Sequence, residues 1–203
     1  MRQGLLLADK LRHHGGMRVY LAGPDVFLPD PVTRAAVLKA VCARHGLCGV
    51  SPLDGLEGGD PVAWDGLGEA MRIARRNEAH ITGCAALVAN LTPFRGPSAD
   101  AGTVFELGFM RALGRPVFGW SNSAEPFAAR SRAFCGDAVR QDEVWRDGEG
   151  MLIEDFPPLA DNLMIDGAIA ASGGVLVVRG VARGGKWRDL AAFEACVAEV
   201  GRR

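Results

Sequence analysis

Short apolar runs alternate with longer helical patterns along most of this sequence, and this alternation restricts the fold more than any other feature. The clearest apolar run covers residues 85–91, where leucine, valine and alanine surround a single asparagine. A continuous run of this kind is typical of a strand that is buried on both faces of a sheet. Strands that alternate with helices pair in parallel and are covered by those helices.

We therefore predict a single-domain α/β fold: a doubly wound, flavodoxin-like sheet of five parallel strands with helices on both faces. Residues 1–16 are expected to be an N-terminal extension, either an expression tag or the product of an alternative start, before a domain at 17–203. Residues 121–160 are expected to be irregular, because they are rich in charge, glycine and proline. The pattern predicts strands at 18–23, 47–50, 85–91, 116–120 and 174–178, and helices at 31–45, 61–81, 100–113, 161–171 and 186–200.

Composition excludes several classes of protein. The 203 residues carry a formal net charge of −1, which argues against a nucleic-acid partner. An apolar run of about 18 residues is absent, so we expect no membrane span, and the lack of a secretory pattern favours the cytoplasm. The five cysteines and four histidines lack the spacing of a metal or redox site. The glycine-rich dinucleotide fingerprint and the Walker loop are also missing.

Ligands of doubly wound sheets bind beyond the carboxyl ends of the strands. In this sequence those ends lead into residues 23–30, 51–60 and 92–100. We therefore expect the functional residues to lie in or beside these three loops.

Glu106 is the anomalous residue of the helix expected at 100–113. It is the one charged side chain between Val104 and Met110, in a helix apolar enough to be buried all round. A buried carboxylate needs a helix N-terminus or hydrogen-bond donors. Helical side chains lean toward the N-terminus, so Glu106 should lie over Gly102 and Thr103, whose small size leaves room for a nucleophile. The alternatives are an arginine partner or a place in a subunit interface.

Three other polar residues each allow two interpretations. Asp100 is either the N-cap of this helix or an acceptor for a ligand hydroxyl, and the two roles are compatible. Tyr20 is either a half-buried sheet residue or a phenol that orients Glu106. Asn77 is a polar residue near a helix end or a ligand contact, and residues 92–97 form a rigid turn or a lid.

Four segments, taken in order, resemble the nucleoside 2-deoxyribosyltransferase family. They are Tyr-Leu-Ala-Gly-Pro-Asp-Val-Phe at 20–27, Ala-Asn-Leu-Thr-Pro-Phe-Arg-Gly at 89–96, Asp-Ala-Gly-Thr-Val-Phe-Glu-Leu-Gly at 100–108, and Asp-Asn-Leu-Met at 161–164. The resemblance extends over roughly residues 17–180. It is greatest to the branch of the family that carries the Pro-Phe-Arg-Gly loop.

The resemblance implies a role for each matching residue. Glu106 corresponds to the family's nucleophile, Tyr20 to the tyrosine that holds it, and Asp100 to the aspartate that contacts the deoxyribose at its 5′-hydroxyl. Asn162 and Met164 correspond to a segment that reaches the sugar from a neighbouring subunit. The resemblance therefore also implies a homo-oligomer, either a dimer or a larger assembly such as a hexamer.

Asn77 departs from the family pattern, because better-known members place an aspartate there that handles the nucleobase. An amide can recognise a base edge but cannot protonate the leaving base as an acid would. Phe27 is a candidate for stacking on a base, and together with Asn77 it leans toward a purine. Gly23 and Gly102, which lie in the matched segments, complete the candidate substrate-binding residues.

The implied activity is the transfer of 2-deoxyribose between nucleobases. It proceeds by a retaining double displacement through a covalent deoxyribosyl ester of Glu106 and needs no metal or cofactor. The partners are a 2′-deoxynucleoside and a free nucleobase, as in nucleotide salvage. The alternatives are a hydrolase of deoxynucleosides or of their 5′-monophosphates, and a catalytically silent nucleoside-binding module. Asp100 would repel a phosphate, whereas Arg95 could bind one.

Overall fold

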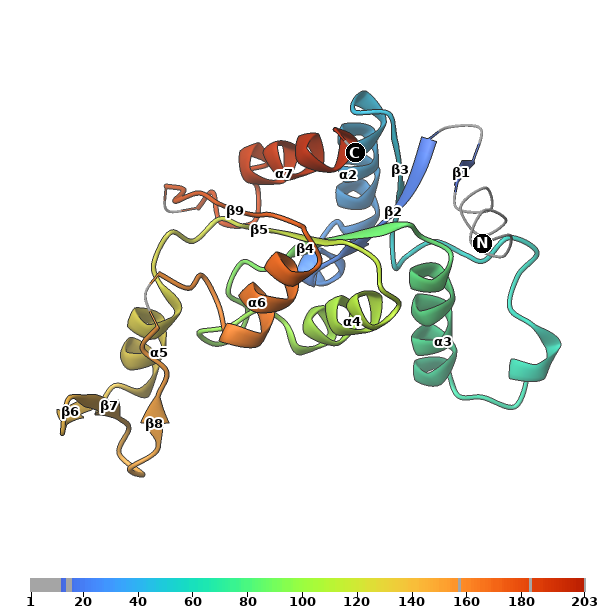
Figure 1. Cartoon of the computed structure of the whole chain (residues 1–203). Helices are drawn as coiled ribbons and strands as arrows, with labels where there is room; N and C mark the ends of the chain where they lie inside the picture. Colours follow the sequence, from blue (N-terminus) through green and yellow to red (C-terminus); the bar gives the residue numbers. More distant parts are fainter. Residues whose placement is uncertain (1–11, 14–15, 157, 183, 203) are drawn as a thin grey trace.

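The computed structural model describes residues 12–13, 16–156, 158–182 and 184–202 (Figure 1). Its main sheet confirms the predicted class. The five parallel strands lie in the spatial order β3, β2, β4, β5, β9. Counted along the chain this is the order 2-1-3-4-5 of flavodoxin-like sheets, so the chain reverses direction across the sheet between β2 and β4. The strands are β2 (Gly16–Ala22), β3 (Leu47–Val50), β4 (Ala86–Asn90), β5 (Val117–Ser121) and β9 (Leu176–Val178).

Part of the expected N-terminal extension joins this sheet. A two-residue strand, β1 (Arg12–His13), pairs antiparallel with Met17 and Gly16 at the start of β2. Residues 1–11 and 14–15 of that segment lie outside the described residues.

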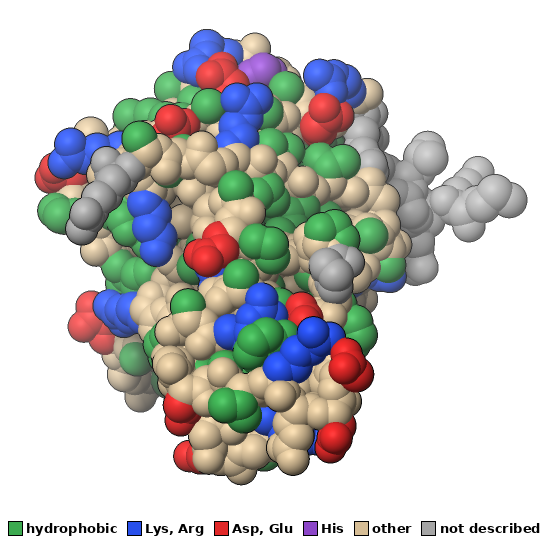
Figure 2. Space-filling model, turned by 90° about the vertical axis from the view of Figure 1, so that its left-hand side faces the viewer, with side chains coloured by type: hydrophobic (Ala, Val, Ile, Leu, Met, Phe, Trp, Pro, Cys, Tyr) green, Lys and Arg blue, Asp and Glu red, His purple; other side chains and the backbone are tan. Residues whose placement is uncertain are grey.

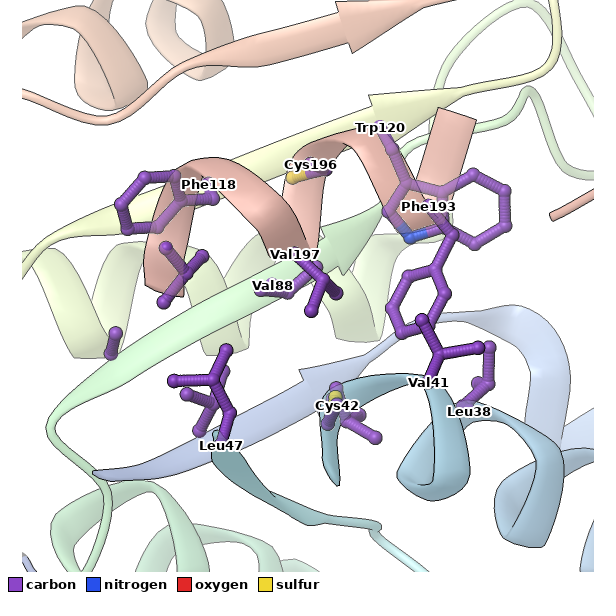
Figure 3. Close-up of a cluster of buried hydrophobic side chains, with 14 of the residues drawn as sticks. Leu38, Val41, Cys42, Leu47, Val88, Phe118, Trp120, Phe193, Cys196 and Val197 are labelled. Atoms are coloured by element: carbon purple, nitrogen blue, oxygen red, sulfur yellow. The ribbon is translucent and has the colours of Figure 1, made fainter. Parts of the chain in front are cut away.

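Helices cover both faces of the sheet, as Figure 1 shows. On one face, α2 (Pro31–Arg44) and α7 (Ala191–Gly201) pack through Val41 and Phe193 against Val88 and Trp120 (Figure 3). The rings of Trp120 and Phe193 lie 5.6 Å apart. The opposite face is covered by α3 (Glu69–Thr82), α4 (Ala101–Ala112) and α6 (Leu163–Ala171).

The second face holds Tyr20 and packs against α4, the helix that carries Glu106. Tyr20 and Leu87 face α4 from adjacent strands, and Leu107 and Met110 of α4 pack against this side of the sheet. Tyr20 is fully buried. This core is therefore apolar except where the phenol of Tyr20 meets α4.

The helix expected at 61–81 is shorter than predicted. The structure has a 3-10 turn, η2 (Val62–Trp64), and α3 begins only at Glu69. Gly66 and Gly68 lie between them. Glycine gains little from the helical conformation and weakens a helix by about 1 kcal/mol, so the two together end the pattern.

The expectation of an irregular stretch at 121–160 is wrong. The segment contains α5 (Phe127–Cys135) and a small antiparallel sheet that projects from the main body (Figure 1). Asp142 and Glu143 both have positive φ, 49° and 66°, and form the two-residue turn of the first hairpin. Two-residue turns of this kind usually contain Asn-Gly or Asp-Gly, so the Asp-Glu pair in this sequence did not indicate a hairpin. The strands are β6 (Val139–Gln141), β7 (Val144–Arg146) and β8 (Leu152–Ile153).

No helix within the described ranges is both long and apolar enough to cross a membrane.

Candidate active site

The loops that follow β2 and β4 are fastened together at the edge where the chain reverses direction. Asn90, at the end of β4, donates its side-chain amide to Asp25 Oδ2 at 2.8 Å. Arg34 of α2 donates to Asp25 Oδ1 at 2.7 Å. A Cβ on Gly23 would lie 2.7 Å from the Cβ of Asn90, so only glycine permits this close approach. Gly23 through its bare backbone and Asp25 through its carboxylate thus hold the two loops together.

Tyr20 and Glu106 meet beneath this edge. The Tyr20 hydroxyl, on β2, donates to Glu106 Oε1, on α4, at 2.7 Å. This contact joins β2, which was expected to supply the orienting phenol, to α4, which was expected to supply the carboxylate.

Asn77 contacts the same carboxylate from the last turns of α3. Its amide nitrogen donates to Glu106 Oε1 at 3.4 Å. Its carbonyl oxygen is buried and has no hydrogen-bond partner among the described residues. The neighbouring Arg76 donates to both carboxylate oxygens of Asp60, at 2.7 and 2.9 Å, which attaches this part of α3 to the loop after β3.

Burial controls the charge of Glu106. It raises the pKa of this carboxyl group to about 7, and the nearby negative charge of Asp100 adds to the rise. The Tyr20 hydrogen bond acts in the opposite direction by stabilising the carboxylate. Burial and the Glu106 charge raise the pKa of Tyr20 as well, so its hydroxyl remains a proton donor. The site therefore holds a carboxyl group that loses its proton near neutral pH.

Asp100 is the N-cap of α4, as one of its two interpretations predicted. Its Oδ2 accepts hydrogen bonds from the Thr103 amide at 2.9 Å and the Thr103 hydroxyl at 3.0 Å. Both bonds reach Oδ2, so neither of them occupies Oδ1. A Cβ on Gly102 would lie 3.1 Å from Asp100 Oδ2, so the small residue leaves the cap uncrowded.

The expectation that α4 is buried all round is wrong for a single chain. Phe105 is 63% exposed, and Gly102 and Gly108 are exposed too. Only one side of the helix packs on the sheet, because no described helix or strand covers the side that carries Phe105. The Phe105 ring stacks on Phe109 one turn further along, with ring centres 6.3 Å apart.

Phe27 stacks within the protein. Its ring lies parallel to Phe94, with centres 5.4 Å apart, and Phe94 meets Trp187 edge-on. The Arg95 guanidinium lies 5.3 Å from the centre of Phe27 and 4.6 Å from that of Phe94. The Pro-Phe-Arg-Gly loop is thus an ordered turn with a cation on aromatic rings, and one face of Phe27 is used.

Asn162 and Met164 lie at the start of α6. Asn162 caps this helix by accepting from the Met164 amide at 3.0 Å, and its own amide group donates to Glu154 at 2.9 and 3.1 Å. Met164 is 72% exposed. In the described part of the chain, the hydrogen bonds of Glu106 reach Tyr20 and Asn77 and not Asn162.

The sequence did not reveal the buried pair of Arg130 and Asp161. The Arg130 side chain, on α5, is 7% exposed and lies 3.8 Å from Asp161, which is 1% exposed. Arg130 lies in a segment rich in charged residues, which are usually exposed, so the sequence pattern did not mark its side chain as buried. Asp161 precedes Asn162 in one of the segments that resemble the family, and this position is the sequence feature that could have identified it.

The described residues contain no group of three histidine, cysteine, aspartate or glutamate side chains placed to hold a metal ion.

The fold and these contacts define a class of protein: a doubly wound α/β protein with a half-buried carboxylate at the point where its sheet reverses direction. Residues 19–164 match the model of the family described as nucleoside 2-deoxyribosyltransferase. The chain belongs to this family and is an enzyme of the deoxyribosyltransferase type.

Two relatives illustrate the similarity. An uncharacterised protein of Schizosaccharomyces pombe is 32% identical over 180 residues, which cover 83% of this chain and 84% of that protein. The solved structure of a 2-deoxyribosyltransferase from Leishmania mexicana is 28% identical, with a TM-score of 0.54. It covers 73% of this chain and 84% of its own.

Proposed function

We propose that this enzyme moves 2-deoxyribose from one nucleobase to another through a covalent ester on Glu106. The observation that carries the proposal is the 2.7 Å hydrogen bond from Tyr20 to Glu106 Oε1. It fixes one oxygen of a half-buried carboxylate and stabilises the charge that a nucleophile needs.

The reaction has two displacements. The free oxygen of Glu106 attacks C1′ of a 2′-deoxynucleoside, and the C1′–N bond breaks with its electron pair leaving on the base. A second base then attacks C1′ of the ester from the side that the first base left and gives up its N–H proton to water, while the C1′–O bond breaks and Glu106 departs as a carboxylate. The two inversions give net retention, and the order of events gives ping-pong kinetics.

Asp100 and Asn77 bind the two ends of the substrate. Asp100 Oδ1 accepts the 5′-hydroxyl, while Oδ2 keeps its bonds to Thr103. The buried carbonyl oxygen of Asn77 lacks a partner within the described chain, and an N–H group of the base would supply one. Because an amide cannot act as a general acid, the departing base takes its proton from water.

Asn162 and Met164 act in the site of a neighbouring subunit. Two exposures support this part of the proposal: Phe105, beside the nucleophile, is 63% exposed, and Met164 is 72% exposed. A large exposed apolar patch is typical of a protein–protein interface. A second copy packed against this side would cover Phe105 and bring Met164 and Asn162 to another site.

The nucleoside is favoured over its 5′-monophosphate. Asp100 would repel a phosphate at the 5′-position. The guanidinium of Arg95, which could favour a phosphate, packs on the rings of Phe27 and Phe94.

The test is a base exchange. Purified protein is incubated with 2′-deoxyinosine, with and without free adenine, and the products are separated by chromatography. We expect 2′-deoxyadenosine only in the tube with adenine, and none with the Glu106→Gln variant. Thymidine and cytosine in the same assay define the range of bases.

Two outcomes would reject the proposal. Equal release of hypoxanthine in both tubes without a new nucleoside would indicate a hydrolase. Unchanged 2′-deoxyinosine in both tubes would call for deoxynucleoside 5′-monophosphates in the same assay, and then for a binding measurement.

A further inference from the structure

The segment just before Asp100 is held by a buried ion pair that lies outside the proposed reacting groups. Asp161 Oδ2 accepts from the Ala99 amide at 2.9 Å, and Asp161 Oδ1 accepts from the Ser98 hydroxyl at 2.5 Å. Arg130 Nε donates to the Pro97 carbonyl at 2.7 Å. Three consecutive residues, 97, 98 and 99, are therefore each bound by Arg130 or Asp161.

The same pair also binds the segment that ends at Asn162. Arg130 Nη2 donates to the Ala160 carbonyl at 2.7 Å, and Asp161 Oδ1 accepts from the Asn162 amide at 2.8 Å. Asp166 completes the arrangement by accepting from the amides of Ala160 and Asp161, at 3.1 and 3.0 Å. Two irregular segments that are distant in sequence are thus joined through one carboxylate and one guanidinium.

A buried ion pair is a costly way to stabilise a fold, because both charges lose their hydration. Here the charged groups supply what apolar side chains cannot: several strong acceptors and donors at fixed angles for backbone groups that belong to no helix or strand. The arrangement therefore suits a task of positioning. The residue that follows Ala99 is Asp100, which caps α4, the helix that carries Glu106.

We propose that Arg130 and Asp161 are positioning residues that fix residues 97–99 and so hold Asp100 in place to bind the deoxyribose. This inference rests on the proposed function for the identity of the ligand. Neither side chain touches the substrate; both act through the loop. A displacement of about 1 Å at a substrate-binding group can reduce the rate about 100-fold.

The test compares Asp161→Asn with a matched control, Asp155→Asn. Asp155 pairs with Arg132 of the same helix α5, at 3.4 Å. In Asp161→Asn the amide group presents N–H where the Ala99 amide needs an acceptor. We expect the KM for 2′-deoxyinosine to rise about tenfold or more and kcat/KM to fall about 100-fold. D155N should change KM less than twofold.

A second measurement is independent of activity. In D161N, hydrogen–deuterium exchange should become faster in the peptide over residues 97–104, and the peptides of β2 and β4 should exchange as in the wild type. If the wild type makes no new nucleoside, the proposed function fails, and this exchange result alone judges the positioning role.

The proposal is overturned if folded D161N keeps both the KM and the exchange rate of the wild type. It is equally overturned if D161N merely lowers the active fraction and the melting temperature with KM unchanged, which is what a purely structural role produces. If D161N does not fold, Ser98→Ala replaces it in this test, because it removes a single hydrogen-bond donor to Asp161. It should raise KM several-fold, and no change in KM and exchange would count against the proposal.

Discussion

The protonation of Glu106 depends on its immediate neighbours. Burial and the charge of Asp100 favour the neutral acid, and the hydrogen bond from Tyr20 favours the carboxylate. The net result is a pKa of about 7. Since only the carboxylate can attack C1′, we expect kcat/KM of the wild type to rise with pH and to level off above about 7.

Replacement of Tyr20 by phenylalanine should move this rise to higher pH. Tyr20→Phe removes the hydroxyl that stabilises the charged form, while the ring continues to fill the core, so the pKa of Glu106 increases. Initial rates of base exchange between pH 5 and 9 measure the shift. If the rise in kcat/KM stays at the same pH or moves to lower pH, the Tyr20 hydroxyl does not stabilise the charged form of Glu106.

The same pKa links stability to pH. The carboxyl group of Glu106 has a usual pKa of 4.5 and one of about 7 in the fold, so the folded protein binds this proton more tightly. Its contribution is complete below pH 4.5 and is lost as the pH rises through about 7. The free energy of unfolding should therefore fall by up to about 3 kcal/mol across this range.

Glu106→Gln should abolish that part of the decrease. Urea unfolding of both proteins at pH 5 and pH 8 provides the comparison, with Asp155→Asn as a control that leaves the buried carboxyl in place. Parallel decreases in the wild type and E106Q would show that Glu106 titrates as an exposed group.

Helix α4 depends on Asp100 for its start as well as for its proposed ligand contact. Asp100→Ser keeps an N-cap oxygen but removes the negative charge, whereas Asp100→Ala removes both. We expect the alanine variant to lose about 1 kcal/mol of stability and the serine variant to lose less. In addition, D100S should accept deoxynucleoside 5′-monophosphates better than the wild type, because the repulsion of the phosphate is gone.

Thermal unfolding and product analysis with both kinds of substrate separate these two effects. If D100S and D100A are equally unstable, the side chain does not act as the cap. If D100S discriminates against the monophosphate as strongly as the wild type, the charge of Asp100 does not set the choice of substrate.

The elements differ in how far the sequence predicted them. The strand at Leu47–Val50 was predicted residue for residue, because glycine and loop residues bound it on both sides. The small sheet was missed, since strands of two or three residues show no periodicity and its acidic turn lacks glycine.

The contact between Tyr20 and Glu106 could be predicted from motifs. The pairing of Arg130 with Asp161 could not, because it depends on how two irregular segments fold together.

At the scale of the whole molecule, exposed apolar side chains remain on several elements. Phe105 and Met164 lie on the helices of the catalytic face. Figure 2 shows further hydrophobic side chains, mixed with charged ones, on the side from which α5 and the small sheet project. Five of the exposed large hydrophobic side chains belong to residues 121–160, the segment expected to be irregular: Phe134, Val139, Met151, Leu152 and Phe156.

Phe105→Lys should dissociate the proposed oligomer, because a charge would be buried at the contact. Val32→Lys is the matched control, since Val32 is 73% exposed on α2, on the opposite face of the sheet. Light scattering coupled to size exclusion measures the mass of each protein. We expect an oligomeric wild type and V32K, and a monomeric F105K with little activity. A monomeric wild type with full activity would reject the shared site.

Folding order follows from the long reach of the hydrogen bond between Tyr20 and Glu106, which are separated by 86 positions. Tyr20 lies on β2, whose neighbour β4 starts only at Ala86, so a large part of the chain must be closed into a loop before the two strands pair. Until then Glu106 remains hydrated and titrates as an ordinary glutamate. We therefore expect the contact between Tyr20 and Glu106 to form late in folding, so that a nascent or partly folded chain lacks the proposed nucleophile.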